Sequence, residues 1–123
     1  QKLGLPYQVV ANSTGDMGFD TARQFDIETW IPSENRYRET HSASNTTDFQ
    51  ARGLNVKYRP TSNSQPPTLQ FVHMLNATAF AIGRIIIAIL ENHQTKTGTV
   101  KIPAALAKYT GFKEIKSPSE KPL

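Results

Sequence analysis

A period-two alternation of hydrophobic and polar residues runs through RQFDIETWI, residues 23–31. Such alternation is typical of a half-buried β-strand, here with Phe25 and Ile27 on one face and Asp26 on the other. β-Branched and aromatic residues predict a second strand in LPYQVVAN, at the start of the chain, and YRETHSAS is a third, more polar extended segment. A fourth strand is expected in TLQFVHML, residues 68–75.

The segment after the third strand has the pattern of an amphipathic helix, expected over residues 46–58. Asn45 begins this segment and Asp48 follows three residues later, which resembles a capping box. The apolar face of this helix is expected to comprise Phe49, Gly53 and Val56, with Leu54 close by.

A second helix is expected over residues 79–93, which are apolar nearly all round and therefore predict a position in the interior of the fold. A short final helix is expected with Pro103 at its first position and Gly111 just past its end.

Strands grouped early, with helices packed on them, predict an α+β fold with an antiparallel sheet. The 123 residues, 37% of them hydrophobic, suffice for one core, so a single domain over 1–123 is expected. Within it, the proline- and serine-rich residues 60–67 are expected to form a flexible loop and residues 114–123 a charged tail.

Composition excludes several classes of site. The chain has no cysteine, which excludes disulfides and thiolate metal sites, and it contains no glycine-rich dinucleotide or P-loop motif. A net charge of +4 tolerates an anionic partner without demanding one. The most apolar run is too short for a bilayer and no signal peptide is apparent, so a soluble protein is expected.

Arg84 interrupts the apolar segment, in the second turn of the helix expected there. Burying an unpaired guanidinium is costly, so an anion should meet it. One alternative is a structural carboxylate, from Glu28, Glu39 or Glu91. The other is a phosphate at the amino end of the helix, where free N–H groups and the helix dipole favour anions. The pattern leaves both open.

Two pairs of polar residues accompany Arg84. Asn76 and Thr78 stand at the strand-to-helix junction, where capping is their ordinary role, although with Arg84 they could line a pocket. Glu39 and Ser42 would face opposite sides of a regular strand, but converging oxygens of this kind would suit Mg²⁺ bridging phosphates. The histidines are expected to be structural or on the surface, because none has a nucleophile partner in sight.

These blocks resemble the carboxyl-terminal part of the catalytic core of the seryl-tRNA synthetase family, which is class II. The resemblance runs almost end to end, through TGDMGFDTARQFDIETWIP, YRETHSASNTTDFQARGLNVKYR and VHMLNATAFAIGRIIIAILENHQ. It implies that Arg84 is the motif 3 arginine that contacts the γ-phosphate of ATP. It also implies that Glu39 binds ATP and its Mg²⁺, with Ser42 beside it in the metal shell.

The resemblance further implies that Asn76 and Thr78 lie near the pocket for serine, where the family reads the substrate hydroxyl. The complete enzyme is expected to be a cytoplasmic homodimer that activates serine with ATP and transfers it to tRNA, with no membrane partner. The chain should hold about the last third of such an enzyme, without motifs 1 and 2, and is therefore expected to be inactive alone.

Two other functions are compatible with the sequence. One is a synthetase-like module that binds or interacts without catalysis. The other is a basic RNA-binding domain that would use Lys108, Lys113 and Lys116 against phosphate. The latter ranks last, because its aromatic residues are not expected to alternate with its basic ones.

Overall fold

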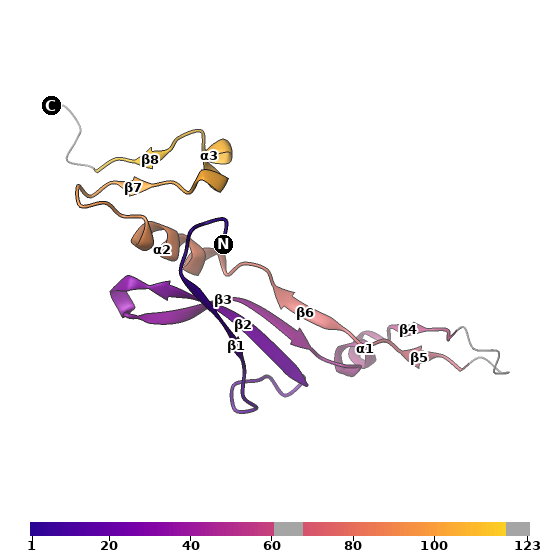
Figure 1. The fold of residues 1–123 in the computed structure, drawn as a ribbon. Coiled ribbons are helices and arrows are strands. Elements are labelled where there is room, and N and C mark those ends of the chain that lie inside the picture. Colours follow the sequence, from indigo (N-terminus) through magenta and orange to yellow (C-terminus); the bar gives the residue numbers. More distant parts are fainter. Residues whose placement is uncertain (61–67, 118–123) are drawn as a thin grey trace. The chain divides into compact units, whose positions relative to one another are not determined.

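The computed structural model describes residues 1–60 and 68–117. Figure 1 shows the elements in the order β1 (Tyr7–Ala11), β2 (Arg23–Ile31), the 3₁₀ helix η1 (Pro32–Glu34), β3 (Arg36–Asn45), α1 (Phe49–Leu54), β4 (Lys57–Tyr58), β5 (Gln70–Phe71), β6 (Leu75–Thr78), α2 (Ile82–Asn92), β7 (Val100–Lys101), α3 (Ala104–Thr110) and β8 (Glu114–Ile115). β1, β2, β3 and β6 form a sheet in that order. The predicted α+β class with an antiparallel sheet is confirmed.

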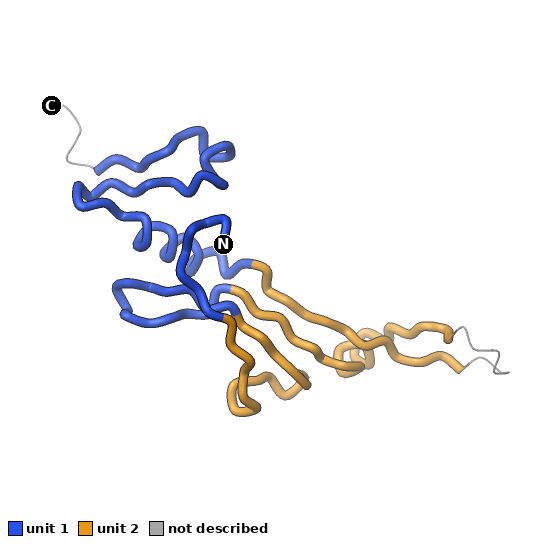
Figure 2. Tube along the Cα trace, viewed as in Figure 1, with its two compact units in different colours: residues 1–8, 27–40, 80–123 blue, residues 9–26, 41–79 orange. Residues whose placement is uncertain are grey.

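The chain divides into two compact units, coloured in Figure 2. Unit 1 comprises Gln1–Gln8, Ile27–Thr40 and Phe80–Leu123, and unit 2 comprises Val9–Asp26 and His41–Ala79. The division does not test whether the chain folds as the single domain expected from the sequence, so that expectation stays a prediction.

The sequence predicted β2 at its observed bounds, and β1 and β3 within one or two residues. The apolar face of β2 is only partly buried. Ile31 is buried in unit 1, whereas Phe25, in unit 2, is 38% exposed beneath the guanidinium of Arg23. On the other face, Asp26 is buried, and its carboxylate accepts hydrogen bonds from Asn12 and Gln24. The alternation of hydrophobic and polar residues therefore predicted the position of the strand but not which of its side chains are buried.

α1 is shorter than the predicted helix, and the capping box is wrong. Asn45 ends β3, where it pairs with Leu75 of β6, and Thr47 has a φ of 47°, which a helix does not accommodate. Asp48 makes no capping hydrogen bond and instead binds Arg52 at 2.6 Å. At the other end, left-handed Asn55 ends the helix before β4 pairs with β5.

The predicted apolar face of this helix is exposed as well. Ala51 is its buried residue, while the side chains expected to be buried are exposed: Phe49, Leu54 and Val56.

α2 confirms the predicted helix, but its expected interior position is wrong. Its buried residues are Ile85, Ala88 and Ile89, whose three- and four-residue spacing defines a single face. Ile82 and Ile86 are 70% and 50% exposed. Within unit 1, α2 is therefore a one-sided helix with apolar side chains on its exposed face.

The strand expected over 68–75 divides into β5 and β6. β6 extends to Thr78, because Leu75–Thr78 pair with β3, and Ala81 stands at the N-cap of α2 without a side-chain cap. The capping role considered for Asn76 and Thr78 is therefore wrong.

The end of the chain is partly as predicted. α3 ends where Gly111 adopts a φ of 76°, a left-handed conformation that favours glycine, while Pro103 is its N-cap rather than its first residue. The tail expected from residue 114 is wrong at its start, since β8 pairs with β7. The rest of the tail, 118–123, and residues 61–67 of the expected loop lie outside the described residues.

Two fully enclosed hydroxyl groups connect β2 and β3 in unit 1. Thr40 is 0% exposed and Thr29 is 2% exposed, and their Oγ1 atoms lie 2.8 Å apart. The Thr40 hydroxyl also donates to the carbonyl of Ile27 at 3.1 Å. Because both groups are buried, the Thr29 hydroxyl depends on Thr40 for its hydrogen bond.

We expect Thr40→Val to lower the free energy of unfolding by about 1–3 kcal/mol, because Thr29 would be left with a buried, unpaired hydroxyl. Urea unfolding followed through Trp30, the single tryptophan, measures this. The double variant Thr29→Val/Thr40→Val should recover part of the loss. Thr97→Val, at an exposed hydroxyl pair, is the control. Equal stability of Thr40→Val and the unchanged chain would contradict the assignment.

Candidate functional site

Arg84 and Glu39 meet in unit 1, where β3 passes the start of α2. The N–H of Ala81 donates to the carbonyl of Thr40 at 2.8 Å, which attaches the amino end of α2 to the strand. Arg84, the third residue of α2, then donates through Nη1 to the main-chain carbonyl of Glu39 and, at 3.3 Å, to its Oε2 atom. The sequence placed Arg84 one turn too late, because the helix begins at Ile82 rather than near residue 79.

The structure selects one of the three carboxylates considered for Arg84. Glu91 accepts hydrogen bonds from the N–H and hydroxyl of Ser33, each at 2.8 Å. Glu28 accepts from Gln8 at 2.6 Å. Glu39 is therefore the partner of Arg84, a pairing across 45 residues.

The expectation of a buried guanidinium is wrong. The side chains of Arg84 and Glu39 are 47% and 40% exposed. An exposed ion pair contributes little to stability, and 3.3 Å is long for a hydrogen bond between charged groups. Both contacts of Arg84 with Glu39 use Nη1, and a guanidinium carries five N–H donors. Arg84 can therefore bind an external anion while it stays attached to β3.

The first turn of α2 is open on the side of its free N–H groups. Ala81 provides no side-chain cap, Ile82 is largely exposed, and a Cβ built on Gly83 would meet no atom within 4 Å. Uncapped N–H groups and the positive end of the helix dipole both favour an anion here. The guanidinium of Arg84 lies in the same turn.

Small polar side chains gather on β3 and β6 in unit 2. Ser42 pairs with Thr78 and Ser44 with Asn76 in the antiparallel register. Residues at this spacing share one face of the sheet, so hydroxyl and amide groups occur together there. Thr78 and Asn76 are exposed.

Gln50 of α1 holds this polar group in place, a role that the sequence did not reveal. Its amide accepts a hydrogen bond from Asn76 at 3.4 Å and donates to Asp20 at 3.0 Å. These three residues come from separate segments of unit 2, so no local spacing could have indicated their contact.

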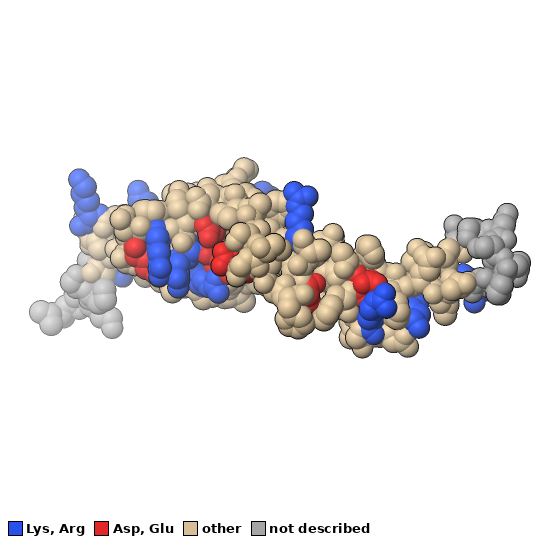
Figure 3. Space-filling view, turned by 90° about the horizontal axis from the view of Figure 1, so that it is seen from below, with Lys and Arg blue, Asp and Glu red and all other residues tan. Residues whose placement is uncertain are grey.

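The predicted site residues thus form two groups. Glu39 and Arg84 are in contact within unit 1, and Ser42, Asn76 and Thr78 belong to unit 2. Within residues 1–60 and 68–117, histidine, aspartate and glutamate side chains do not gather in threes as a metal cluster would require. Figure 3 shows acidic and basic side chains beside one another on one face of the chain.

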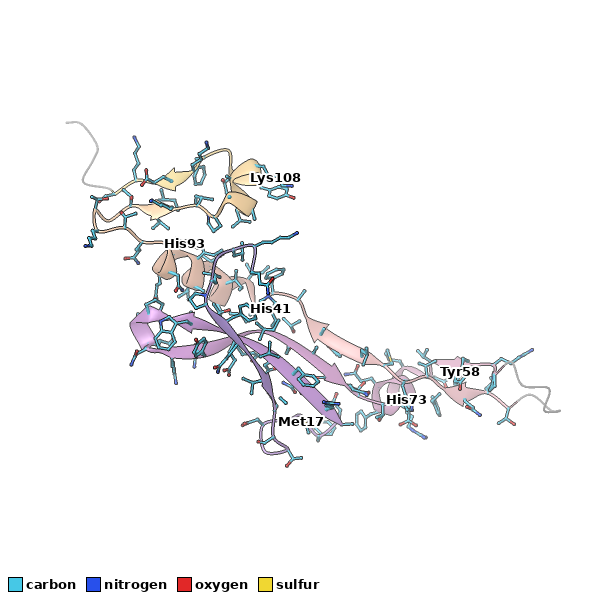
Figure 4. All side chains as sticks on the ribbon, viewed as in Figure 1. Met17, His41, Tyr58, His73, His93 and Lys108 are labelled. Atoms are coloured by element: carbon cyan, nitrogen blue, oxygen red, sulfur yellow. The ribbon has the colours of Figure 1, made fainter. Side chains whose placement is uncertain are left out.

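The histidines have the structural or surface positions expected. His93 is half-buried, with Nε2 2.8 Å from the carbonyl of Leu3 in unit 1, and His73 is exposed. His41 is half-buried on β3, and burial lowers its pKa because desolvation penalises the charged imidazolium. His41 therefore loses its charge more readily than a histidine in water does. Figure 4 labels all three.

No helix in the described part of the chain combines the length and the apolar character needed to cross a bilayer.

Comparison with known proteins identifies the family. Residues 1–93 match the model of the tRNA synthetase class II core domain (G, H, P, S and T). A serine–tRNA ligase of Pyrococcus furiosus is 56% identical over 115 residues, which cover 94% of this chain and 25% of that protein. The chain therefore spans about a quarter of the length of this relative, rather than the expected third.

Two solved structures are similar over nearly the whole chain. The seryl-tRNA synthetase of Pyrococcus horikoshii complexed with ATP has a TM-score of 0.85 and 52% identity, and the match covers 93% of this chain and 25% of that one. The cytoplasmic serine–tRNA ligase of Naegleria fowleri in complex with AMP has a TM-score of 0.83 and 43% identity, covering 95% and 27%. The chain belongs to the class II tRNA synthetase core family.

Proposed function

We propose that this chain is part of a serine–tRNA ligase and supplies the Arg84–Glu39 pair to its ATP site. The observation that carries the proposal is the position of Arg84, whose guanidinium lies half-exposed in the open first turn of α2 and is attached to β3 through Glu39. The 52% identity to a synthetase that was solved in complex with ATP supports ATP as the ligand.

In this proposal Arg84 binds the terminal phosphate of ATP. A guanidinium can donate two parallel hydrogen bonds to phosphate oxygens, and the amino end of α2 adds a favourable dipole. Activation of an amino acid by ATP needs little covalent chemistry from the protein and much electrostatic positioning of phosphates. Because the main-chain carbonyl of Glu39 holds Arg84 before ATP arrives, the donor is already oriented.

Glu39 would hold Mg²⁺ through its carboxylate. A carboxylate is a hard oxygen donor of the kind that this ion takes, and the ion binds one or two protein oxygens with phosphate and water as the others. Ser42, which belongs to unit 2, stays a predicted ligand. The half-exposed carboxylate of Glu39 fits this role, since its contact with Arg84 uses only Oε2. When bound, the ion would neutralise phosphate charge.

Asn76 and Thr78 would line the site for serine, and Thr78 would recognise its hydroxyl through a hydrogen bond. Both are exposed on β6, and Ser42 and Ser44 lie opposite them in the register. A site that binds a substrate hydroxyl in this way rejects analogues without it far better than an apolar pocket does.

The proposal extends to the complete enzyme. It would transfer the seryl group to tRNA, act as a homodimer and work in the cytoplasm. The names of the relatives support tRNA as a substrate, and the relative from Naegleria fowleri is named cytoplasmic.

Titration of ATP into the chain, with and without Mg²⁺, tests the nucleotide site. We expect Arg84→Ala to weaken ATP binding about tenfold or more, since a hydrogen bond to a charged group contributes about 1.5–3 kcal/mol. Isothermal titration calorimetry measures the affinity.

The matched control is Arg36→Ala, which removes another exposed arginine–glutamate pair of unit 1, at 2.7 Å from Glu34. It should leave ATP binding unchanged. Equal losses in the two variants would show that ATP responds only to overall charge, and the proposed nucleotide site would be wrong.

A further inference from the structure

All of the excess positive charge of the chain lies after residue 93. Residues 94–123 contain six lysines and two glutamates, whereas residues 1–93 contain eight basic and eight acidic residues. The basic segment also begins where the family match ends. Such a charge asymmetry indicates an anionic partner for this part of the chain.

Within this segment, the end of α3 presents two lysines and two aromatic rings on one turn, here called the lysine–aromatic turn: Lys108, Tyr109, Phe112 and Lys113. The ring of Tyr109 is 76% exposed, and Nζ of Lys108 lies 4.7 Å from its centre. Phe112 is 49% exposed. Figure 4 labels Lys108 on α3.

Backbone geometry fixes the lysine–aromatic turn. Gly111 adopts the left-handed conformation that ends α3, and the hydroxyl of Thr110 donates to the carbonyl of Phe112 at 2.8 Å. The N–H of Ile102 donates to the carbonyl of Lys113 at 2.9 Å, which ties the turn to the segment after β7. The backbone that carries the two rings is therefore held in place.

The lysines of this turn are available to an anion. In the described part of unit 1, neither Lys108 nor Lys113 forms an ion pair. The nearest acid in sequence, Glu114, accepts a hydrogen bond from the Thr99 hydroxyl at 2.5 Å.

The earlier expectation that aromatic and basic residues do not alternate is wrong here, because Tyr109 and Phe112 stand between Lys108 and Lys113. Ammonium groups bind phosphates, and exposed aromatic rings stack on unpaired bases, which a duplex does not offer. An acidic peptide would satisfy the charges but would leave the rings without a partner.

We propose that the lysine–aromatic turn binds a single-stranded segment of RNA. The choice of RNA rests on the proposed function, which includes tRNA. The surface itself is independent of the ATP site, because its variants leave Arg84 and Glu39 unchanged. Failure here and failure of the ATP titration are therefore distinguishable.

Fluorescence anisotropy with a labelled oligouridine of about 12 nucleotides tests the proposal on the whole chain. We expect Tyr109→Ala to weaken binding by about 5- to 160-fold, which corresponds to about 1–3 kcal/mol for one stacked base. Tyr109→Phe should retain binding, because the ring remains. Lys113→Ala should reduce the slope of log affinity against log salt by about 0.7.

The matched control is Lys57→Ala in unit 2, which removes another lysine located 4.7 Å from an aromatic ring, that of Phe71. It should change binding little. Lys108→Ala should weaken binding, because it removes a phosphate contact. An equal loss in Lys57→Ala would indicate non-specific attraction and overturn the proposal, as would equal affinity for duplex RNA or no binding at low salt.

Photo-crosslinking provides a readout that does not depend on the variants. A 4-thiouridine in the same oligonucleotide should crosslink to the peptide that carries Tyr109 and Phe112. Crosslinks confined to other peptides would overturn the proposal.

Discussion

Replacement of Arg84 by alanine is expected to lower serine-dependent ATP–pyrophosphate exchange about 100-fold or more. The measurement uses a chimera in which this chain replaces the matching quarter of the Pyrococcus furiosus relative, to which it is 56% identical. Removing one preoriented donor to a charge that develops in the transition state costs about 10²–10³ in rate. Arg84 is such a donor in the proposed site, because the carbonyl of Glu39 holds it in place.

Two further variants of the chimera separate charge from geometry. Arg84→Lys keeps the charge but loses the planar fork, so it should recover only part of the rate. Arg36→Ala, at the exposed pair with Glu34, should retain full exchange. If the Arg84→Ala chimera were as active as the unchanged chimera, Arg84 would have no part in the reaction.

The chain alone is expected to form no detectable seryl-adenylate under conditions in which the chimera is active. It spans about a quarter of the length of the relatives it matches, and in the proposed function it contributes one arginine to a reaction that depends on several groups arranged around the phosphates. Mixing the chain with serine, radiolabelled ATP and Mg²⁺, followed by chromatography of the products, measures this.

The control for this second prediction is the chimera itself, assayed at the same concentration. Adenylate formation by the chain at a rate near that of the chimera would show that its own residues suffice for activation. The proposal that activation also needs groups from the rest of the longer enzyme would then be wrong.

Elements with a strong local pattern could be predicted from the sequence. Alternation located β2, and the apolar run located α2 to within three residues of its start. Gly111 marked the end of α3, because a left-handed residue is a local requirement. These features depend on neighbours in the sequence.

Features that depend on distant pairing could not be predicted. Asn45 belongs to β3 because Leu75 pairs with it, and Thr78 belongs to a strand because Ser42 lies opposite. The assumed tail forms a strand because Val100 pairs with Ile115. No local pattern contains this information.

The candidate site shows the same division. The sequence indicated that Arg84 needs an anion and named Glu39 among three carboxylates, but only the fold shows which of them lies beside it. The burial of α2 was overestimated, because an apolar run predicts a helix without revealing how many of its faces are covered.

The attachment of Arg84 to a peptide carbonyl has a consequence for engineering. Every amino acid at position 39 supplies that same oxygen, so substitutions there leave the anchor of the guanidinium in place. In the proposed site, the side chain at position 39 can therefore be substituted to alter Mg²⁺ binding while the guanidinium of Arg84 keeps its contact with the main chain.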